Sequence, residues 1–327
     1  MSETTNIEWC DSTFNPWIGC TKVSPACDHC YAERSTPARV HSVAWGAHAE
    51  RRRTSPANWA LPRRWNAQAA AFQQQHGHRQ RVFCASLADV FDNQVPDQWR
   101  ADLYELIAAT PNLDWLLLTK RIGNAATMLP SYMGGDLVPN VWLGATICNQ
   151  EEADRDIPKL LAVPARVRFL SIEPMLGAIS FEGMFANPAQ PNDGTNALEA
   201  LDWVICGGES GPGARPMHPD WARDLRDQCA ASGTPFLFKQ WGEWVELDTG
   251  MPQPLVARFG DDEFYDAAMQ HDGFLSAAGH FTDHVDLMHD DEPYRGLVRR
   301  PKKANGRLLD GRTHDGFPAP AEAGGNG

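Results

Sequence analysis

Short apolar runs alternate with longer amphipathic stretches over most of the chain. The runs cover residues 14–18, 81–86, 114–119, 141–146, 167–172, 201–206 and 235–239, and we predict helices at 96–109, 149–161 and 219–232. Strands with almost no polar interruption are typical of a parallel sheet that is covered on both faces. The pattern predicts an α/β fold, a complete or partial (β/α) barrel of about seven strands, with a doubly wound open sheet as the alternative.

Polar residues follow six of these runs, at the point where each predicted strand ends. They occupy positions 86–89, 119–121, 146, 171–174, 207–210 and 239–241. Any one of them could be a helix cap or a solvated loop. Six together indicate a site at the carboxyl end of the sheet, where (β/α) barrels carry their chemistry.

The regular pattern stops near residue 242, which divides the chain into three predicted parts. Residues 1–242 form the barrel, and residues 243–317 form an irregular C-terminal extension. Within the extension, we expect residues 302–317 to be an ordered closing segment without a helix. Residues 318–327 are of low complexity and are predicted to be a disordered tail.

Apolar runs of strand length are too short to span a membrane, and the polar, acidic first residues do not form a signal peptide, so we expect a cytoplasmic protein. The net charge of −13 disfavours non-specific wrapping of nucleic acid. Local basic charge occurs at residues 51–65, where five arginines accompany Trp59 and Trp65. This stretch is predicted either to contact single-stranded nucleic acid or to be a solvated face whose tryptophans pack on the barrel.

Four of the eight cysteines lie within the first 30 residues, and three of them share one predicted loop. The loop reads GCTKVSPACDHCYAER and contains Cys20, Cys27 and Cys30. A C-x-x-C pair lets two thiolates reach one metal or cluster, and a third cysteine leaves the site one ligand short of closure. The isolated Cys84 and Cys206 lie in apolar runs and are expected to be core residues.

Two chemistries use three cysteines, a catalytic zinc ion and an iron–sulfur cluster with one open iron. A closed structural zinc site is an alternative if Cys10, His29 or a distant histidine supplies a fourth ligand. A thioredoxin-like redox pair and chance clustering are further alternatives. The arrangement favours an open iron–sulfur site.

The segment CDHCYAE, on a loop after the first predicted strand, resembles the signature of the radical-SAM superfamily. The resemblance implies that Cys20, Cys27 and Cys30 bind three irons of a 4Fe–4S cluster, and that the fourth iron binds S-adenosyl-L-methionine for reductive cleavage to a radical. It also implies an electron donor such as flavodoxin or ferredoxin. The first gap is six residues here and three in the superfamily, and the Gly-Gly-Glu sequence follows the sixth predicted strand instead of the second.

A closer resemblance covers nearly the whole chain. It rests on IEWCDSTFNPWIGCTKVSPACDHCYAE (7–33), LLLTKR (116–121), VRFLSIEPMLG (167–177), LDWVICGGESGPGARPMHPDW (201–221) and FKQWG (238–242). These segments are similar to a phage- and bacteria-associated three-cysteine-motif family of unknown function. Cys10 stands where that family has a hydroxyl residue, so it is not expected to be a fourth ligand.

The strand ends complete the predicted site. Backbone N–H groups in the glycine-rich stretch 207–213 and a nearby arginine guanidinium suit an anion. The anion is either the methionine carboxylate or a phosphate. The alternative interpretation of 207–213 is a flexible loop without a ligand. The predicted cofactor-binding residues are Ser86, Asp89, Thr119, Gly207, Gly208, Glu209 and Arg215, and the catalytic candidates are Lys120, Glu173 and Glu209.

Three functions are compatible with these residues. The first is a radical-SAM-type enzyme that modifies a nucleobase, in single-stranded nucleic acid or in a nucleotide. The second is a radical-SAM-type enzyme that acts on a peptide or a small metabolite. The third is a non-catalytic binding protein that zinc or a cluster stabilises.

Overall fold

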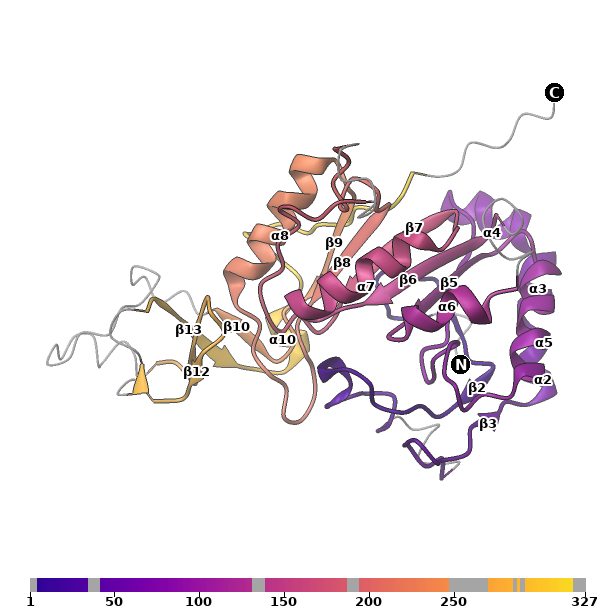
Figure 1. Ribbon diagram of the computed structural model, residues 1–327, viewed down its shortest axis with the longest axis horizontal. Helices are drawn as coiled ribbons and strands as arrows, with labels where there is room; N and C mark the ends of the chain where they lie inside the picture. The colour runs from indigo at the N-terminus through magenta and orange to yellow at the C-terminus, as the bar shows by residue number, and fades with distance from the viewer. Residues whose placement is uncertain are drawn as a thin grey trace, which may run out of the picture.

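The main body of the protein is a curled sheet of seven parallel strands, drawn in Figure 1. The computed structural model describes residues 5–34, 42–130, 139–186, 194–246, 270–284, 287–288 and 292–319. The strands follow one another in the order β1-β4-β5-β6-β7-β8-β9. They are β1 (Ser12–Phe14), β4 (Arg81–Cys84), β5 (Asp114–Thr119), β6 (Val141–Thr146), β7 (Val167–Ile172), β8 (Trp203–Gly207) and β9 (Phe236–Gln240). The predicted partial (β/α) barrel is confirmed.

Helices follow the strands and cover the outer face of the sheet (Figure 1). They are α2 (Pro56–Trp59), α3 (Leu61–Ala67), α4 (Ala69–His76), α5 (Asp97–Ala108), α6 (Ile122–Met128), α7 (Gln150–Ala162) and α8 (Pro219–Ser232). Helices α5, α7 and α8 match the three predicted helices within one residue at each end. Among the described residues, no helix is long and apolar enough to cross a membrane.

Alternate residues of each strand enter two separate hydrophobic clusters. The cluster on the helix-covered face includes Val204 and Cys206 of β8, together with Leu160 of α7. The cluster on the inner face includes Trp203 and Ile205 of the same strand. Successive side chains of a strand point to opposite faces, so a sheet covered on both sides needs apolar residues at every position. The unbroken apolar runs in the sequence have this cause.

The inner face is closed by both ends of the chain. Trp9 and Cys10 pack into the inner cluster, and Phe317 packs against it. The C-terminal segment also pairs with β9, where the N–H of Phe238 donates to the carbonyl of His314 at 2.9 Å. Side chains therefore fill the half-barrel, and the carboxyl end of the strands is left for a site.

The first predicted strand, 14–18, is two strands in the structure. Strand β1 ends at Phe14, and β2 (Trp17–Ile18) pairs antiparallel with β3 (Arg52–Arg53) outside the main sheet. Pro16 lies between them and has no N–H to donate, which explains the break. Strand β2 leads into the cysteine loop, as predicted.

The C-terminal extension contains a small antiparallel sheet where an irregular segment was expected. Its order is β10-β13-β11-β12, from strands β10 (Trp244–Glu246), β11 (Gly273–Ser276), β12 (Phe281–Thr282) and β13 (Tyr294–Arg299). Most of these strands are too short to show alternation in the sequence. The closing segment begins with a short helix, α10 (Lys302–Asn305), contrary to expectation, and continues without helix. Most of the predicted tail, residues 320–327, lies outside the described residues.

Gly144 of β6 provides a test of the inner packing. A Cβ atom at this position would lie 2.3 Å from the ring of Phe169, which is fully buried. We expect Gly144→Ala to lower the free energy of unfolding by about 1–3 kcal/mol, because the ring has no space to move. Gly123→Ala in α6 is the control, since its Cβ would meet only Lys159 at 3.7 Å, an ordinary contact. Urea unfolding in which both variants match the wild type would contradict the packing.

Candidate functional site

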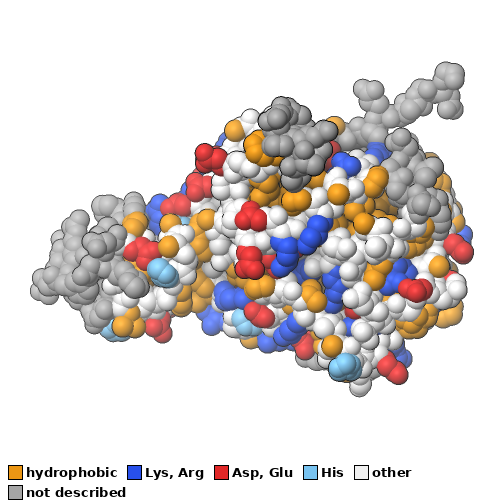
Figure 2. All heavy atoms as spheres, viewed as in Figure 1, with side chains coloured by type: hydrophobic (Ala, Val, Ile, Leu, Met, Phe, Trp, Pro, Cys, Tyr) orange, Lys and Arg blue, Asp and Glu red, His pale blue; other side chains and the backbone are white. Residues whose placement is uncertain are grey.

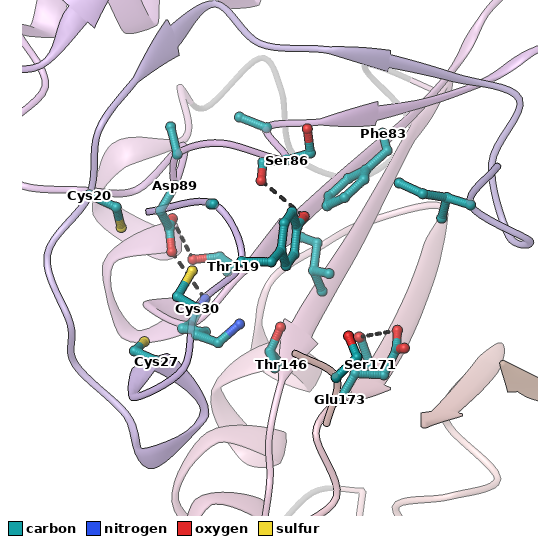
Figure 3. Close-up of a pocket in the computed structure, with 18 of the residues that line it drawn as sticks. Cys20, Cys27, Cys30, Phe83, Ser86, Asp89, Thr119, Thr146, Ser171 and Glu173 are labelled. Atoms are coloured by element: carbon teal, nitrogen blue, oxygen red, sulfur yellow. Dashed lines mark hydrogen bonds between the residues drawn. The ribbon is translucent and has the colours of Figure 1, made fainter. Parts of the chain in front are cut away.

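A cavity of about 340 Å³ lies at the carboxyl end of the strands, between the cysteine loop and the sheet. Figure 3 shows Cys20, Cys27 and Cys30 on one side of the cavity and Ser171 and Glu173 on another. Of the predicted site residues, the cavity brings together Cys20, Cys27, Cys30, Ser86, Asp89, Thr119, Lys120 and Glu173. Gly207, Gly208, Glu209 and Arg215 do not line it.

Side chains alternate between the two faces of each strand, and this alternation explains which of them face the cavity. Thr146 follows Trp142 and Gly144 on the inner face of β6, and Ser171 follows Phe169 on the inner face of β7. Lys239 follows Leu237 in the same way on β9. At the end of each strand, the inner face therefore changes from apolar packing to polar groups.

The cysteine loop contains little regular secondary structure, but hydrogen bonds hold it in place. Its one turn of 3₁₀ helix, η1 (Pro25–Cys27), is capped by Ser24, whose hydroxyl accepts from the N–H of Ala26 at 3.1 Å. All three thiols are free; Cys27 is buried, and Cys20 and Cys30 are half-buried. Burial raises the pKa of Cys20 to about 11, with Asp89 adding to the shift and Arg121 opposing it.

Asp89 organises the wall of the cavity beside Cys20. One carboxylate oxygen accepts from the hydroxyl of Thr119 at 2.7 Å and from the N–H of Phe91 at 2.9 Å. The other accepts from the N–H of Lys120 at 3.1 Å and from Arg121 at 3.2 Å. A carboxylate offers about four acceptor positions, so these bonds satisfy Asp89. Asp89 positions its neighbours and has little capacity left for a cofactor.

Arg121 connects this wall to the cysteine loop. Its guanidinium donates to Sγ of Cys20 at 3.3 Å and to the carbonyl of Thr21 at 2.6 Å. The ion pair with Asp89 raises its pKa, although burial opposes the shift. Lys120 follows Thr119 and lines the cavity, and its ammonium makes no ion pair with any described residue.

The far wall of the cavity carries four charged residues, of which the sequence analysis did not single out Glu8 and Lys302. Nζ of Lys239 lies 2.8 Å from Oε1 of Glu173, which also accepts from the hydroxyl of Ser171 at 3.2 Å through its other oxygen. Burial acts to lower the pKa of Lys239, but Glu173 outweighs it and the pKa is raised. Glu8 and Lys302 line the same region. The strand-end pattern included Lys239, whereas Glu8 and Lys302 come from the two ends of the chain and give no local signal.

Gly207 and Gly208, at the start of the glycine-rich segment, pack against their neighbours, and Ser210 of the same segment lines the cavity. A Cβ at Gly208 would lie 1.8 Å from the carbonyl oxygen of Trp241, and one at Gly207 would lie 2.9 Å from Oε1 of Glu173. Both positions therefore need glycine for close approach. Gly207 and Gly208, predicted to bind a cofactor, do not line the cavity in this structure.

Glu209 and Arg215 brace the cysteine loop from outside the cavity. Arg215 bonds Glu209 at 2.7 Å, the carboxylate of Asp28 at 3.0 Å and the carbonyl of Pro25 at 2.8 Å. Nδ1 of His29 lies 2.9 Å from Glu209. Burial acts to raise the pKa of Glu209, but hydrogen bonds from Arg215 and His29 outweigh it and lower the pKa.

Two of the three arginines at 51–53, Arg51 and Arg53, are held in ion pairs within the fold. The side chain of Arg51 has no exposed surface and pairs with Asp92 at 2.7 Å. Arg53 pairs with Asp102 at 2.6 Å and stacks over the ring of Trp59. Composition could not distinguish buried from exposed arginines. Figure 2 shows Lys and Arg side chains mixed with Asp and Glu on the face in view, without a continuous basic surface.

The donor set fits a cluster with three protein ligands. Besides Cys20, Cys27 and Cys30, the cavity is lined by no cysteine and no histidine among the described residues. Cys10 is buried in the inner core, and His29 is bound to Glu209. Among the described residues, no three Cys, His, Asp or Glu side chains converge on a point suited to one metal ion. In the described part of the chain, the three sulfurs line one cavity without forming a site for a single metal ion.

A protein-family model described as "Protein of unknown function (DUF5131)" matches residues 4–318. This agrees with the expected membership, over nearly the whole chain, in a family of unknown function. No curated protein matches the chain, and no solved structure does.

The burial of Arg51 leads to a direct test. We expect Arg51→Gln to lower the free energy of unfolding by about 3–5 kcal/mol, because Asp92 would remain as an uncompensated buried charge. Arg52→Gln, at an exposed position of β3, is the matched control and should change stability by less than about 0.5 kcal/mol. Equal stability of the two variants in urea unfolding would show that Arg51 is not part of the core.

The brace around Glu209 predicts a pH dependence. Because the pKa of Glu209 is lowered in the folded protein, its stabilisation is present above the unfolded pKa of about 4.3 and is lost as the pH falls through the folded value. Glu209→Gln should therefore be less stable than the wild type at pH 7, and the difference should shrink below about pH 4. Glu33→Gln, in a more exposed ion pair with Lys22, is the control and should have little effect. A difference between Glu209→Gln and the wild type that does not change with pH would argue against the brace.

Proposed function

The chain belongs to the DUF5131 family of proteins of unknown function, and we propose that it is an iron–sulfur enzyme that uses S-adenosylmethionine for radical chemistry. One observation carries the proposal. Three free cysteines of a single loop line a cavity at the carboxyl end of a partial (β/α) barrel, where enzymes of this architecture have their active sites.

Cys20, Cys27 and Cys30 would hold a 4Fe–4S cluster. Three thiolates leave one iron without a protein ligand, and no other cysteine or histidine among the described residues lines the cavity to close the site. With S-adenosylmethionine bound, such a cluster supplies one-electron cleavage of the sulfonium to methionine and a carbon radical. The electron would come from a donor such as flavodoxin or ferredoxin.

The side chains around the cavity would bind and orient the cluster and S-adenosylmethionine, and would shield a radical from water. Arg121 donates to Sγ of Cys20 and stabilises negative charge on that sulfur. The free ammonium of Lys120 suits the methionine carboxylate, and the hydroxyl of Ser86, which accepts from Asn15 at 2.9 Å, keeps its own proton to donate. Trp9, Phe83 and Trp45 give the cavity apolar walls that limit access of water to a radical.

The substrate that we propose is a nucleobase, in nucleic acid or in a nucleotide. Aromatic walls together with buried charged groups suit a flat, polar ring better than a flexible aliphatic metabolite. The alternative is a structural zinc site without catalysis, and the next experiments distinguish it from the iron–sulfur enzyme.

The ligand assignment is tested by iron content. After anaerobic reconstitution, the wild type should bind about four irons and should release 5′-deoxyadenosine from S-adenosylmethionine under reducing conditions. Alanine at Cys20, Cys27 or Cys30 should abolish both, because each would remove one of only three ligands. Cys84→Ala and Cys206→Ala change buried cysteines of β4 and β8 and should retain the iron.

Cys10→Ser distinguishes an open site from a closed one. Because Cys10 lies in the inner core and not in the cavity, the variant should keep the cluster and the cleavage of S-adenosylmethionine. Loss of the cluster in Cys10→Ser would favour a site closed by four cysteines. A colourless wild-type protein with one zinc per chain would refute the proposal and support a structural role.

A further inference from the structure

The wall of the cavity formed by Glu8, Glu173, Lys239, Gln240 and Lys302 is a built polar site away from the cysteines. Figure 3 shows Glu173 well separated from Cys20, Cys27 and Cys30. We infer that this wall binds a guanine-type base through the edge that carries its N1–H, its 2-amino group and its 6-oxo group. The inference deepens the proposed function by naming the substrate class, but binding itself needs no cluster.

The hydrogen-bond acceptors of this wall are incomplete. Oε2 of Glu8 and Oε1 of Gln240 are buried and have no hydrogen-bond partner among the described residues. Oε1 of Glu173 is satisfied by Lys239, whose Nζ lies 2.8 Å away, so the open acceptors of this wall are those of Glu8 and Gln240. A buried acceptor without a donor costs about 1–3 kcal/mol, so a ligand with several N–H groups would remove the penalty at Glu8 and at Gln240.

Gln240 shows how the chain fixes this pattern. Its side chain is only 6% exposed, and its amide nitrogen donates to the carbonyl of Gly208 at 3.4 Å. That contact requires a donor, which leaves the amide oxygen as the acceptor. Because Gly208 lies against Trp241, the carbonyl that orients Gln240 is itself held in place.

The same wall also carries positive charge. Lys239 pairs with Glu173, and Lys302 makes no ion pair with any described residue. Burial lowers the pKa of Lys302, and the nearby charge of Lys239 adds to the shift. An acceptor on the ligand beside these ammonium groups would therefore be bound strongly.

A guanine base matches this combination of groups. It presents N–H donors at N1 and N2 next to acceptors at O6 and N7, and lysine is a common partner of O6 and N7. Adenine has an acceptor at N1, which would face the carboxylates and be rejected. A zwitterionic amino acid would satisfy one carboxylate and one ammonium and would leave Gln240 unpaired.

Aromatic side chains supply the remaining contact. Trp9 and Phe83 line the cavity with ring centroids 4.5 Å apart. Enzymes that act on a base hold it by stacking and by hydrogen bonds to its pairing edge. The base could belong to a free nucleoside or to a single strand from which it is extruded, and the experiment separates these sources.

The test is isothermal titration of the full chain, both as purified and after anaerobic reconstitution. Guanosine should bind, inosine should bind at least about tenfold more weakly because it lacks the 2-amino donor, and adenosine should bind more weakly still. Glu8→Gln and Lys302→Met should each weaken guanosine at least about tenfold. Glu105→Gln, an exposed change on α5, is the control and should leave binding unchanged.

Two measurements keep the outcome unambiguous. Iron content of Glu8→Gln should equal that of the wild type, so failure of the base site is distinct from failure of the cluster assignment. An oligothymidylate with one guanosine that binds tighter than the nucleoside identifies a single strand as the source, and weaker binding identifies the free nucleoside; both support the base site. Adenosine binding as tightly as guanosine, unchanged binding by Glu8→Gln and Lys302→Met, or no nucleoside binding at all would overturn it.

Discussion

Two buried arginines fix the cysteine loop to the sheet, and the rest of the site depends on them. Arg51 pairs with Asp92 and donates to the hydroxyl of Thr21 at 2.7 Å, whereas Arg121 pairs with Asp89 and donates to the carbonyl of Thr21. Thr21, next to Cys20, is thus held between two guanidinium groups. A loop with almost no regular structure has little else to fix its position, so these ion pairs set where the first cysteine meets the cavity.

The other end of the loop is held by different residues from a different strand. Arg215, which follows β8, reaches Asp28 and the carbonyl of Pro25, and Glu209 binds His29. The first anchor comes from Arg51, just before β3, and from the segments after β4 and β5, and the second comes from the segment after β8. The cysteine loop is therefore anchored at both of its ends, by residues from different parts of the sheet. This explains why Glu209 and Arg215 are essential to the geometry although neither lines the cavity.

The sequence predicted a parallel sheet and a cysteine loop beside the carboxyl ends of its strands, because both depend on local sequence pattern. Apolar runs mark strands buried on both faces, and polar residues such as Thr146 and Ser171 continue the inner alternation beyond the packed core. It could not predict Glu8 and Lys302, which reach the cavity only because the chain ends close the half-barrel. It also misread Arg51, since a basic run has the same composition whether it faces solvent or an aspartate in the core. The short strands of the C-terminal sheet show too little alternation to be recognised.

Packing inside the half-barrel determines how ligands can enter. Trp142, Phe169 and Trp203 fill the inner face below the strand ends, and the rings of Trp203 and Phe317 lie 4.9 Å apart where the C-terminal segment crosses. Trp9 fills the same face from the N-terminal end. These rings fill the inner face, and the cavity with room for a ligand lies at the carboxyl end of the strands. The cysteines and the charged wall lie at separate parts of that cavity, so each can contact a different part of what binds there.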